Sequence, residues 1–241
     1  MTTRSARALF GLAGLLLAST PAWAQYYRPY HRDPDRGTDL RVWVGGFFPD
    51  GHSTYWDDKF RDFSGKIGDF DAVTGGGDFQ FRLDRHSALM LSATYYYGAA
   101  TQAYRNFTDN FGGRIRHDGS LDIGSFTGAY VFHFVGRRGQ VDPYVGAGGG
   151  LYVWRLRESG DFIDFTTNPR SIFTSTLTSS GTTGGYFFLA GLEFPLTPAV
   201  SLFVEGRYLK ASDTLGGDFA GFGKLDLSGK SVGGGVSWHL Y

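Results

Sequence analysis

The ten residues 200–209, VSLFVEGRYL, decide the fold because their character changes at every second position. Leu202 and Val204 share one face of an extended chain, whereas Glu205 and Arg207 fall on the other. An Arg side chain near the middle of a bilayer costs about 2–4 kcal/mol, so the charged face cannot meet lipid. The stretch therefore predicts a strand with one apolar face and one face turned toward a polar interior.

This strand is expected at 199–209, and seven further stretches have a strand-like pattern of similar length: 40–48, 73–83, 88–98, 121–134, 143–155, 184–194 and 228–241. Each is long enough to cross a bilayer at a tilt, which takes about 9–11 residues. The connections alternate between short turns (84–87, 135–142, 195–198) and long polar stretches (49–72, 99–120, 156–183, 210–227). This asymmetry is typical of outer-membrane barrels. We therefore predict an all-β protein, a transmembrane antiparallel up-and-down β-barrel of eight strands with short periplasmic turns and long extracellular loops.

Two other architectures fit parts of the pattern. A soluble lipocalin-like barrel would also alternate, but it would not need the strict difference between short and long connections. A barrel of ten strands would arise if residues 162–167 and 171–177, which flank Asn168-Pro169-Arg170, formed a further hairpin across the membrane. We expect that hairpin to be an extension above the membrane instead.

The charged faces of the predicted strands carry both signs, and we expect them to form a paired network inside the barrel. Eight strands enclose an interior that side chains can fill, so at most a narrow pore would remain. Glycines on the same inward face should make room for bulky neighbours; these are Gly146, Gly148 and Gly150, beside Tyr144, Tyr152 and Trp154. The residues expected in the inward charge network are Arg41, Asp78, Arg82, Glu193, Glu205 and Arg207.

Residues 1–24 have the features of a signal peptide. Arg4 and Arg7 precede an apolar run, and Ala22-Trp23-Ala24 provides the small residues of a cleavage site. We expect export through the periplasm, a flexible periplasmic leader at 25–38 that is rich in Pro, Arg and Tyr, and a barrel domain at 39–241. The chain has no Cys, which excludes disulfides and lipid attachment. The mature chain has a net charge near −2, without the clustered basic excess of a nucleic-acid-binding protein.

The carboxyl terminus, Gly235-Val236-Ser237-Trp238-His239-Leu240-Tyr241, resembles the closing signal of bacterial outer-membrane barrels. The stretches PYVGAGGG (143–150) and LFVEGRY (202–208) are similar to strands of the outer-membrane β-barrel superfamily, which includes the transmembrane domain of outer membrane protein A and the opacity-type surface proteins. This resemblance implies a place in the outer membrane, contact with its lipid and lipopolysaccharide, and recognition by the barrel-assembly machinery through the C-terminal strand. The barrel-closing residues would be Gly235, Trp238, Leu240 and Tyr241.

Few residues point to chemistry, and we expect no catalytic, cofactor-binding or metal-binding residues. The six histidines lack zinc-ligand spacing, and the acidic residues of 49–72 lack the order of a calcium loop. Ser237 and His239 share one face and could be drawn as a hydrolytic pair with Glu205 or Glu193. The predicted function is a non-catalytic outer-membrane surface protein with an envelope structural or loop-mediated binding role. The alternative is a barrel enzyme that modifies outer-membrane lipid, such as a lipid A acyl hydrolase.

Overall fold

A computed structural model describes residues 37–109, 111–136, 141–165 and 170–240. The predicted signal peptide and leader lie outside these residues, except that Gly37 and Thr38 begin the first strand. Among the residues that the structure describes, no helix is long and apolar enough to cross a membrane.

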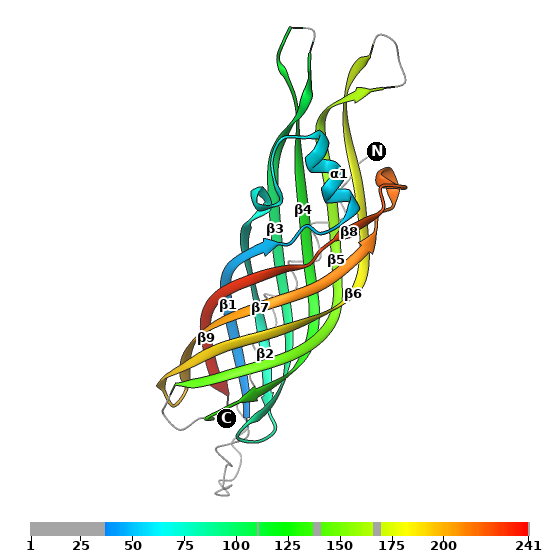
Figure 1. The fold of residues 1–241 in the computed structure, drawn as a ribbon. Coiled ribbons are helices and arrows are strands. Elements are labelled where there is room, and N and C mark those ends of the chain that lie inside the picture. Colours follow the sequence, from blue (N-terminus) through cyan, green and yellow to red (C-terminus); the bar gives the residue numbers. More distant parts are fainter. Residues whose placement is uncertain (1–36, 110, 137–140, 166–169, 241) are drawn as a thin grey trace, which may run out of the picture. The chain divides into compact units, whose positions relative to one another are not determined.

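Eight strands form a closed antiparallel ring, in which each strand pairs with the next along the chain and the last pairs with the first (Figure 1). This closure confirms the predicted eight-stranded up-and-down barrel. A short ninth strand, β8 (Lys224–Asp226), pairs with the end of the seventh outside the ring. The ring consists of β1 (Gly37–Pro49), β2 (Ala72–Arg82), β3 (Ser87–Thr108), β4 (Arg114–His133), β5 (Asp142–Asp164), β6 (Ser171–Thr197), β7 (Val200–Thr214) and β9 (Gly229–Leu240).

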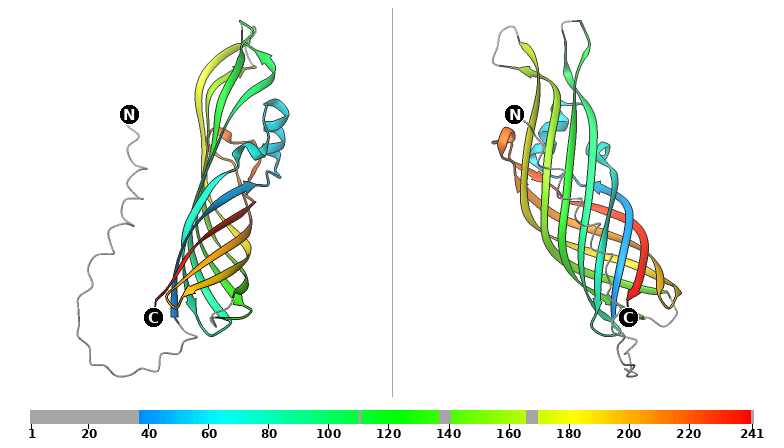
Figure 2. Two further views of the ribbon diagram at one scale, coloured as in Figure 1. Left: turned by 90° about the vertical axis from the view of Figure 1, so that its left-hand side faces the viewer. Right: turned by 180° about the vertical axis from the view of Figure 1, so that it is seen from behind.

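The two ends of the barrel differ. The described ends of the chain, Gly37 and Leu240, lie at the same end as the short connections β2–β3, β4–β5 and β6–β7 (Figure 1). In outer-membrane barrels short turns face the periplasm, so we name this the inner end and the opposite one the outer end. The hairpins β3–β4 and β5–β6 continue far beyond the others at the outer end (Figures 1 and 2).

The prediction that 99–120 and 156–183 are loops is wrong for most of their length. β3 to β6 contain 20 to 27 residues each, about twice what a membrane crossing requires. The polar outward residues of these segments predict loops, yet their inward positions are buried and many of them are apolar, such as Ile115 and Leu156. The outer parts of β5 and β6 are therefore the predicted extension, and they add no strand to the ring.

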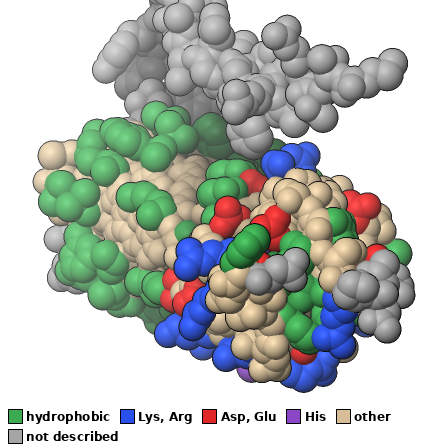
Figure 3. Space-filling model, turned by 90° about the horizontal axis from the view of Figure 1, so that it is seen from above, with side chains coloured by type: hydrophobic (Ala, Val, Ile, Leu, Met, Phe, Trp, Pro, Cys, Tyr) green, Lys and Arg blue, Asp and Glu red, His purple; other side chains and the backbone are tan. Residues whose placement is uncertain are grey.

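An apolar belt covers the outside of the barrel. On β7, Leu202 and Val204 are 42% and 49% exposed, whereas Phe203 and Glu205 point inward at 2% and 7%. Seen from the outer end, apolar side chains cover the barrel wall, while acidic and basic ones gather at the outer end (Figure 3). A closed ring with an apolar exterior and a polar interior is a transmembrane barrel of the outer-membrane type. The exposed apolar residues include Val42, Val44, Phe48, Val73, Phe79, Phe81, Leu89, Leu91, Tyr95, Tyr97, Phe126, Tyr130, Phe132, Val145, Leu151, Val153, Tyr186, Phe188, Leu192, Leu202, Val204, Tyr208, Val232, Trp238 and Leu240.

The inward rings of β5 are accommodated by the neighbouring strand. A Cβ atom at Gly191 would collide with Tyr144, and one at Gly181 would lie 2.9 Å from the Trp154 ring. Both glycines belong to β6 and pair across the sheet with these same residues. The expected role of glycine in making room for large rings therefore falls to glycines on the partner strand.

The outer end has its own apolar core. The segment between β1 and β2 folds into α1 (Thr54–Asp62) and the 3-10 turn η1 (Ile67–Phe70), and the β7–β9 segment contains η2 (Gly217–Phe219) and β8. Their side chains pack against the inward face of the extended strands. The fully buried Trp56 of α1 lies in this core and makes an edge contact with Phe70 (5.2 Å between ring centroids). The predicted first loop is therefore a folded cap, because its aromatic residues are buried on the extension.

Candidate functional site

The interior of the membrane-spanning part is closed by ion pairs. Arg41 donates hydrogen bonds to the Tyr144 hydroxyl (2.6 Å) and to Glu205 (3.2 Å), and Tyr144 also donates to Glu205 (2.8 Å). Arg207 pairs with both Glu205 and Asp78. Four of the six predicted inward charges thus share one cluster with Tyr144. Its side chains come from β1, β2, β5 and β7, so the cluster links strands around the whole ring.

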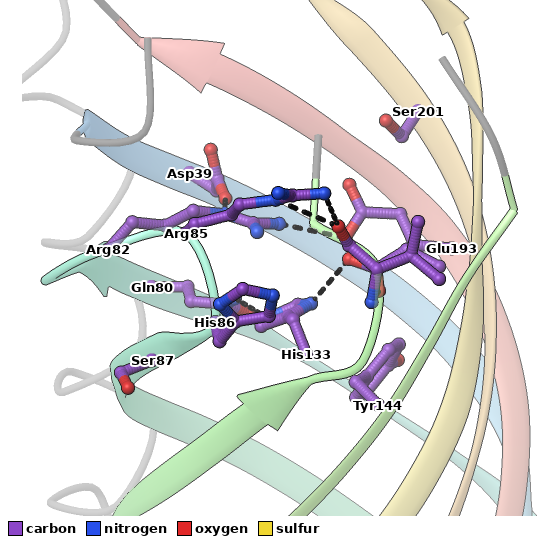
Figure 4. A network of polar contacts seen from close by, with 12 residues as sticks. Asp39, Gln80, Arg82, Arg85, His86, Ser87, His133, Tyr144, Glu193 and Ser201 are labelled. Atoms are coloured by element: carbon purple, nitrogen blue, oxygen red, sulfur yellow. Dashed lines mark hydrogen bonds and ion pairs between the residues drawn. The ribbon is translucent and has the colours of Figure 1, made fainter. Parts of the chain in front are cut away.

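A second cluster lies nearer the inner end. Arg82 pairs with Glu193 (3.3 Å) and with Asp39 (3.0 Å), and Figure 4 shows it reaching between these two carboxylates. His133 donates to Asp142 (2.9 Å), and Gln80 donates to the other ring nitrogen of His133 (2.6 Å). The remaining two predicted charges, Arg82 and Glu193, therefore belong to this second cluster.

One row in this cluster has the hydrogen-bond order of a hydrolytic triad. The Ser201 hydroxyl donates to His239 Nε2 (2.8 Å), and His239 Nδ1 donates to Asp39 (2.9 Å). His239 thus contacts Ser201 rather than Ser237, whose hydroxyl makes no hydrogen bond within the described part of the chain. Ser201 is only 1% exposed, so a substrate carbonyl cannot reach its oxygen. The row is consistent with a polar plug.

A cavity lined by described residues lies at the outer end, above the apolar belt. It has a volume of about 440 Å³, within the range of small-molecule sites, whereas a cavity inside the barrel beside Trp43 and Tyr96 holds about 60 Å³. Its walls come from α1, β3, β5, β6 and the η2 region. The lining residues are Tyr55, Asp58, Lys59, Asp62, Phe63, Tyr104, Asn106, Phe107, Glu158, Phe162, Phe165, Leu177, Phe219 and Phe222.

The helical spacing of residues in α1 determines which of its side chains face the cavity. Tyr55 and Lys59 are four residues apart and so lie on one face, while Trp56 and Phe60 stack on the neighbouring face. Arg105 of β3 holds the end of the helix, because its guanidinium donates to the carbonyl oxygens of Phe60 (3.2 Å) and Phe63 (2.7 Å). A cation at the carboxyl end of a helix also interacts favourably with the helix dipole.

Glu158 on β5 joins the helix to the extension. Its carboxylate accepts hydrogen bonds from the Tyr55 hydroxyl (2.6 Å) and from the Lys59 ammonium. Burial raises the pKa of Glu158, but the charge and hydrogen bonds of Lys59 and Tyr55 outweigh burial and hold that pKa below its usual range. Burial and the adjacent carboxylate raise the pKa of Tyr55 well above its ordinary value. Near neutral pH this wall of the cavity therefore carries an ionised carboxylate and a protonated phenol.

Two polar side chains behind this wall lack hydrogen bonds. Gln102 and His117 pair across β3 and β4, and both are at least 98% buried. Neither the Gln102 amide nor the two His117 ring nitrogens make a hydrogen bond to the described residues. Burial lowers the pKa of His117 against the opposing effect of Glu158, whose Oε2 lies 3.7 Å from the ring. His117 is therefore neutral at pH 7 and packed among aromatic rings.

The barrel-closing residues lie on the last strand, where β9 pairs with β1. Gly235 faces Trp43, Trp238 faces Leu40, and a side chain at Gly235 would collide with the backbone of β1. Leu240 pairs with Thr38, and Tyr241 is outside the described residues. Their part in recognition by an assembly machinery remains a prediction.

Sequence reasoning missed several residues of both sites. Asp39 has the same period-two relation to Arg41 that identified the other inward charges, so the pattern could have found it. Lys59 and Glu158 fell in segments assigned to loops, and only the i, i+4 spacing of Tyr55 and Lys59 hinted at a helix face. In the described part of the chain, no group of three or more His, Asp or Glu side chains is placed to hold a metal ion.

No protein-family model and no curated protein sequence matches this chain. Among solved structures, it is similar to the outer membrane protein OprG from Pseudomonas aeruginosa, with 12% identity, a TM-score of 0.48 and coverage of 86% of this chain and 97% of that one. It is also similar to Neisserial surface protein A (15% identity, TM-score 0.47, 83% and 95% covered). The N-terminal β-barrel domain of Pseudomonas aeruginosa OprF gives 15% identity, a TM-score of 0.38, and 85% and 98% coverage. These neighbours are small bacterial outer-membrane β-barrels, and at such identities the likeness is one of architecture.

Proposed function

We propose that this bacterial outer-membrane β-barrel is a non-catalytic surface protein that binds a small molecule in its outer cavity. The observation that carries the proposal is the contrast between the two ends of the interior. Ion pairs fill the membrane-spanning part, whereas the 440 Å³ cavity lies above the membrane on a folded cap. Binding at the cell surface therefore fits the structure better than passage through the barrel.

A fragment screen on refolded protein in detergent micelles tests this function. Water-soluble aromatic fragments are monitored by saturation-transfer NMR, and those that bind should lose their signal in Leu177→Trp, which fills the cavity. Ile172→Trp, on the same strand but 41% exposed and outside the cavity lining, is the matched control and should bind as the unaltered protein does. Fragments that bind both variants equally, or no binding at all, would contradict the proposal.

The alternative function is hydrolysis of acyl chains of outer-membrane lipid. The row Ser201, His239 and Asp39 has the required order, but its serine is buried at the inner end, far from a substrate in the outer leaflet. Mass spectra of lipid A from cells with and without the protein separate the two functions. Identical spectra support the binding role, and loss of an acyl chain only in cells with the protein supports the enzyme.

We further propose two partners of the barrel: lipopolysaccharide near the outer end, and the barrel-assembly machinery at the C-terminal strand. Three basic side chains follow the exposed apolar residues toward the outer end of their strands: Arg155 and Arg157 come after Val153 on β5, and Lys210 comes after Tyr208 on β7. These side chains suit the phosphate groups of lipopolysaccharide. The C-terminal strand, with Gly235 and Trp238, is the proposed recognition element for the barrel-assembly machinery. Removal of residues 1–24 and a leader before the barrel complete the proposed domain organisation.

A further inference from the structure

The outer cavity is lined by aromatic rings to an unusual degree. Eight of its lining side chains are Phe or Tyr, contributed by α1, β3, β5, η2 and the residues that follow these elements. The face of an aromatic ring carries partial negative charge and attracts a cation within about 6 Å of its centroid. Rings alone would also suit a neutral apolar molecule, so the charges decide between these two kinds of ligand.

The charged groups of the lining are mainly acidic. Three carboxylates, those of Asp58, Asp62 and Glu158, face one ammonium group, that of Lys59. Arg61 pairs with Asp58 (2.8 Å) and Asp62 (3.3 Å) but is not part of the lining, and its side chain is 68% exposed. Asp58 and Asp62 are themselves 46% and 58% exposed, so solvent screens both members of these pairs. Within the lining itself, the carboxylates outnumber the ammonium group three to one.

Cations of this chain already lie over four of the eight rings. The Lys59 ammonium lies 5.6 Å from the Tyr55 ring centroid and 5.9 Å from that of Phe63. The Arg170 guanidinium lies 5.0 Å from the Phe107 centroid and 5.3 Å from that of Phe165. The rings at two separate places in the cavity therefore have the geometry to accept a positive charge.

Resting on the proposed binding function, we propose that the ligand of this cavity is a small organic cation with an apolar body, such as an aryl-alkyl ammonium compound. The rings of Phe162, Phe219 and Phe222 contact the apolar body and face its charge. Asp58 and Asp62 at α1 attract the ammonium group from the outside. An organic anion of the same shape meets both the carboxylates and the negative ring faces, so it is excluded.

Three water-soluble probes with one phenyl body test the sign of the charge: 2-phenylethylammonium, 2-phenylethanol and 3-phenylpropanoate. Each is titrated calorimetrically into refolded protein in detergent micelles, and the heats from protein-free micelles are subtracted. We expect the cation to bind about tenfold tighter than the alcohol, and the carboxylate to bind most weakly. Equal binding of the cation and the alcohol, or tighter binding of the alcohol, would overturn the cation inference.

Two variants locate the effect in the cavity. Phe222→Leu removes one ring face but keeps an apolar side chain, and Asp58→Asn removes one charge at constant size. Each should weaken binding of the cation about two- to fivefold and change binding of the alcohol less. Their matched controls are Phe111→Leu, at a residue 97% exposed outside the cavity, and Asp122→Asn on the outward face of β4. These controls should leave all three affinities unchanged.

The outcomes separate this inference from the proposed function. The cation inference is wrong if none of the three probes binds. It is also wrong if the control variants weaken binding of the cation as much as the cavity variants do. Fragments that bind the unaltered protein and are lost only in Leu177→Trp would still support a surface binding protein, but one for a neutral ligand.

Discussion

Arg41 and Tyr144 lie on opposite walls of the barrel, and their side chains meet across its interior with 2.6 Å between Nη2 and the phenol oxygen. β1 and β5 are four strands apart in either direction around the eight-stranded ring, so no two strands are farther apart. The guanidinium also stacks on the Phe203 ring of β7, with 3.7 Å to the centroid. One buried arginine of β1 therefore links β1 to both β5 and β7 across the barrel, and the stability of the barrel should depend on its partners.

Glu205→Ala should destabilise the barrel strongly, because Glu205 is the shared partner of Arg41 and Arg207. Removing it leaves two buried guanidinium groups undercompensated, and breaking a buried pair in this way costs about 3–5 kcal/mol. Asp58→Ala breaks an exposed pair with Arg61, worth under about 1 kcal/mol. Urea unfolding in lipid vesicles measures both variants. Equal effects would mean that Glu205 lies in a loose, wet lumen.

The folded and unfolded forms should migrate differently on a detergent gel. The ring has no free edge strand, and every strand of it pairs on both sides, so detergent without heat cannot open it. We expect one apparent size for unboiled protein and another after boiling. Identical migration, or recovery of the protein from the soluble fraction, would contradict a membrane barrel.

Cleavage of the precursor should occur between Ala24 and Gln25, because the small residues Ala22 and Ala24 meet the requirement of signal peptidase. Amino-terminal sequencing of membrane-extracted protein is the measurement. A mature protein that still begins with Met1 or Thr2 would contradict export by this route.

The cap at the outer end should loosen below neutral pH. Burial lowers the pKa of His117, so the unfolded chain binds a proton near pH 6.5 while the folded chain resists it. The neutral His117 therefore makes its full contribution to the free energy of unfolding above about pH 6.5. This contribution is lost as the pH falls toward the pKa of His117 in the folded protein. Glu158 stays ionised in this window, because its pKa lies below its usual range. Amide hydrogen exchange in α1, corrected for intrinsic rates, should be faster at pH 5.5 than at pH 7.5.

His117→Phe is the matched variant for this experiment. The ring of His117 packs against Phe63 (4.4 Å between centroids) and Phe162 (5.5 Å), so a phenyl ring suits the site. In this variant, the protection of the α1 amides against hydrogen exchange should change little between pH 5.5 and pH 7.5. A variant with the same pH dependence as the unaltered protein would show that another group is responsible.

Periodicity was sufficient to predict the barrel but not the cap. Inside the membrane, lipid requires outward residues to be apolar, so Leu202 and Glu205 reveal their faces directly in the sequence. Above the membrane, water replaces lipid, and outward positions such as Arg155 and Asp122 become polar, while inward positions are buried and carry both apolar and polar side chains. The extended strands then resemble loops in composition, which is why the sequence pattern wrongly predicts loops at 99–120 and 156–183.

The outer cavity could not be predicted because its parts are distant in the chain. Tyr55, Glu158 and Phe219 come from three different connections, and their meeting depends on how α1 and η2 pack on the extension. The charge network was more accessible, because each member occupies an inward position of a regular strand. The partner choices within it, such as Arg82 with both Asp39 and Glu193, depend on strand stagger and were not visible in the sequence.

The protein should not conduct as a general porin. Porins with aqueous channels use about 16–18 strands, whereas the interior of an eight-stranded barrel is just wide enough for side chains to fill. Here that interior is filled: Arg41, Tyr144 and Glu205 hydrogen-bond across it, and the second cluster around Arg82 lies nearer the inner end. An ion entering from either side would have to displace at least one of these charge pairs, and rearrangement of the pairs should give at most small, intermittent events. Planar-bilayer recordings and a sugar-uptake assay in vesicles are the measurements. A steady, large conductance or rapid uptake of sugars would show that the clusters do not close the lumen, and the function would then lie inside the barrel rather than in the outer cavity.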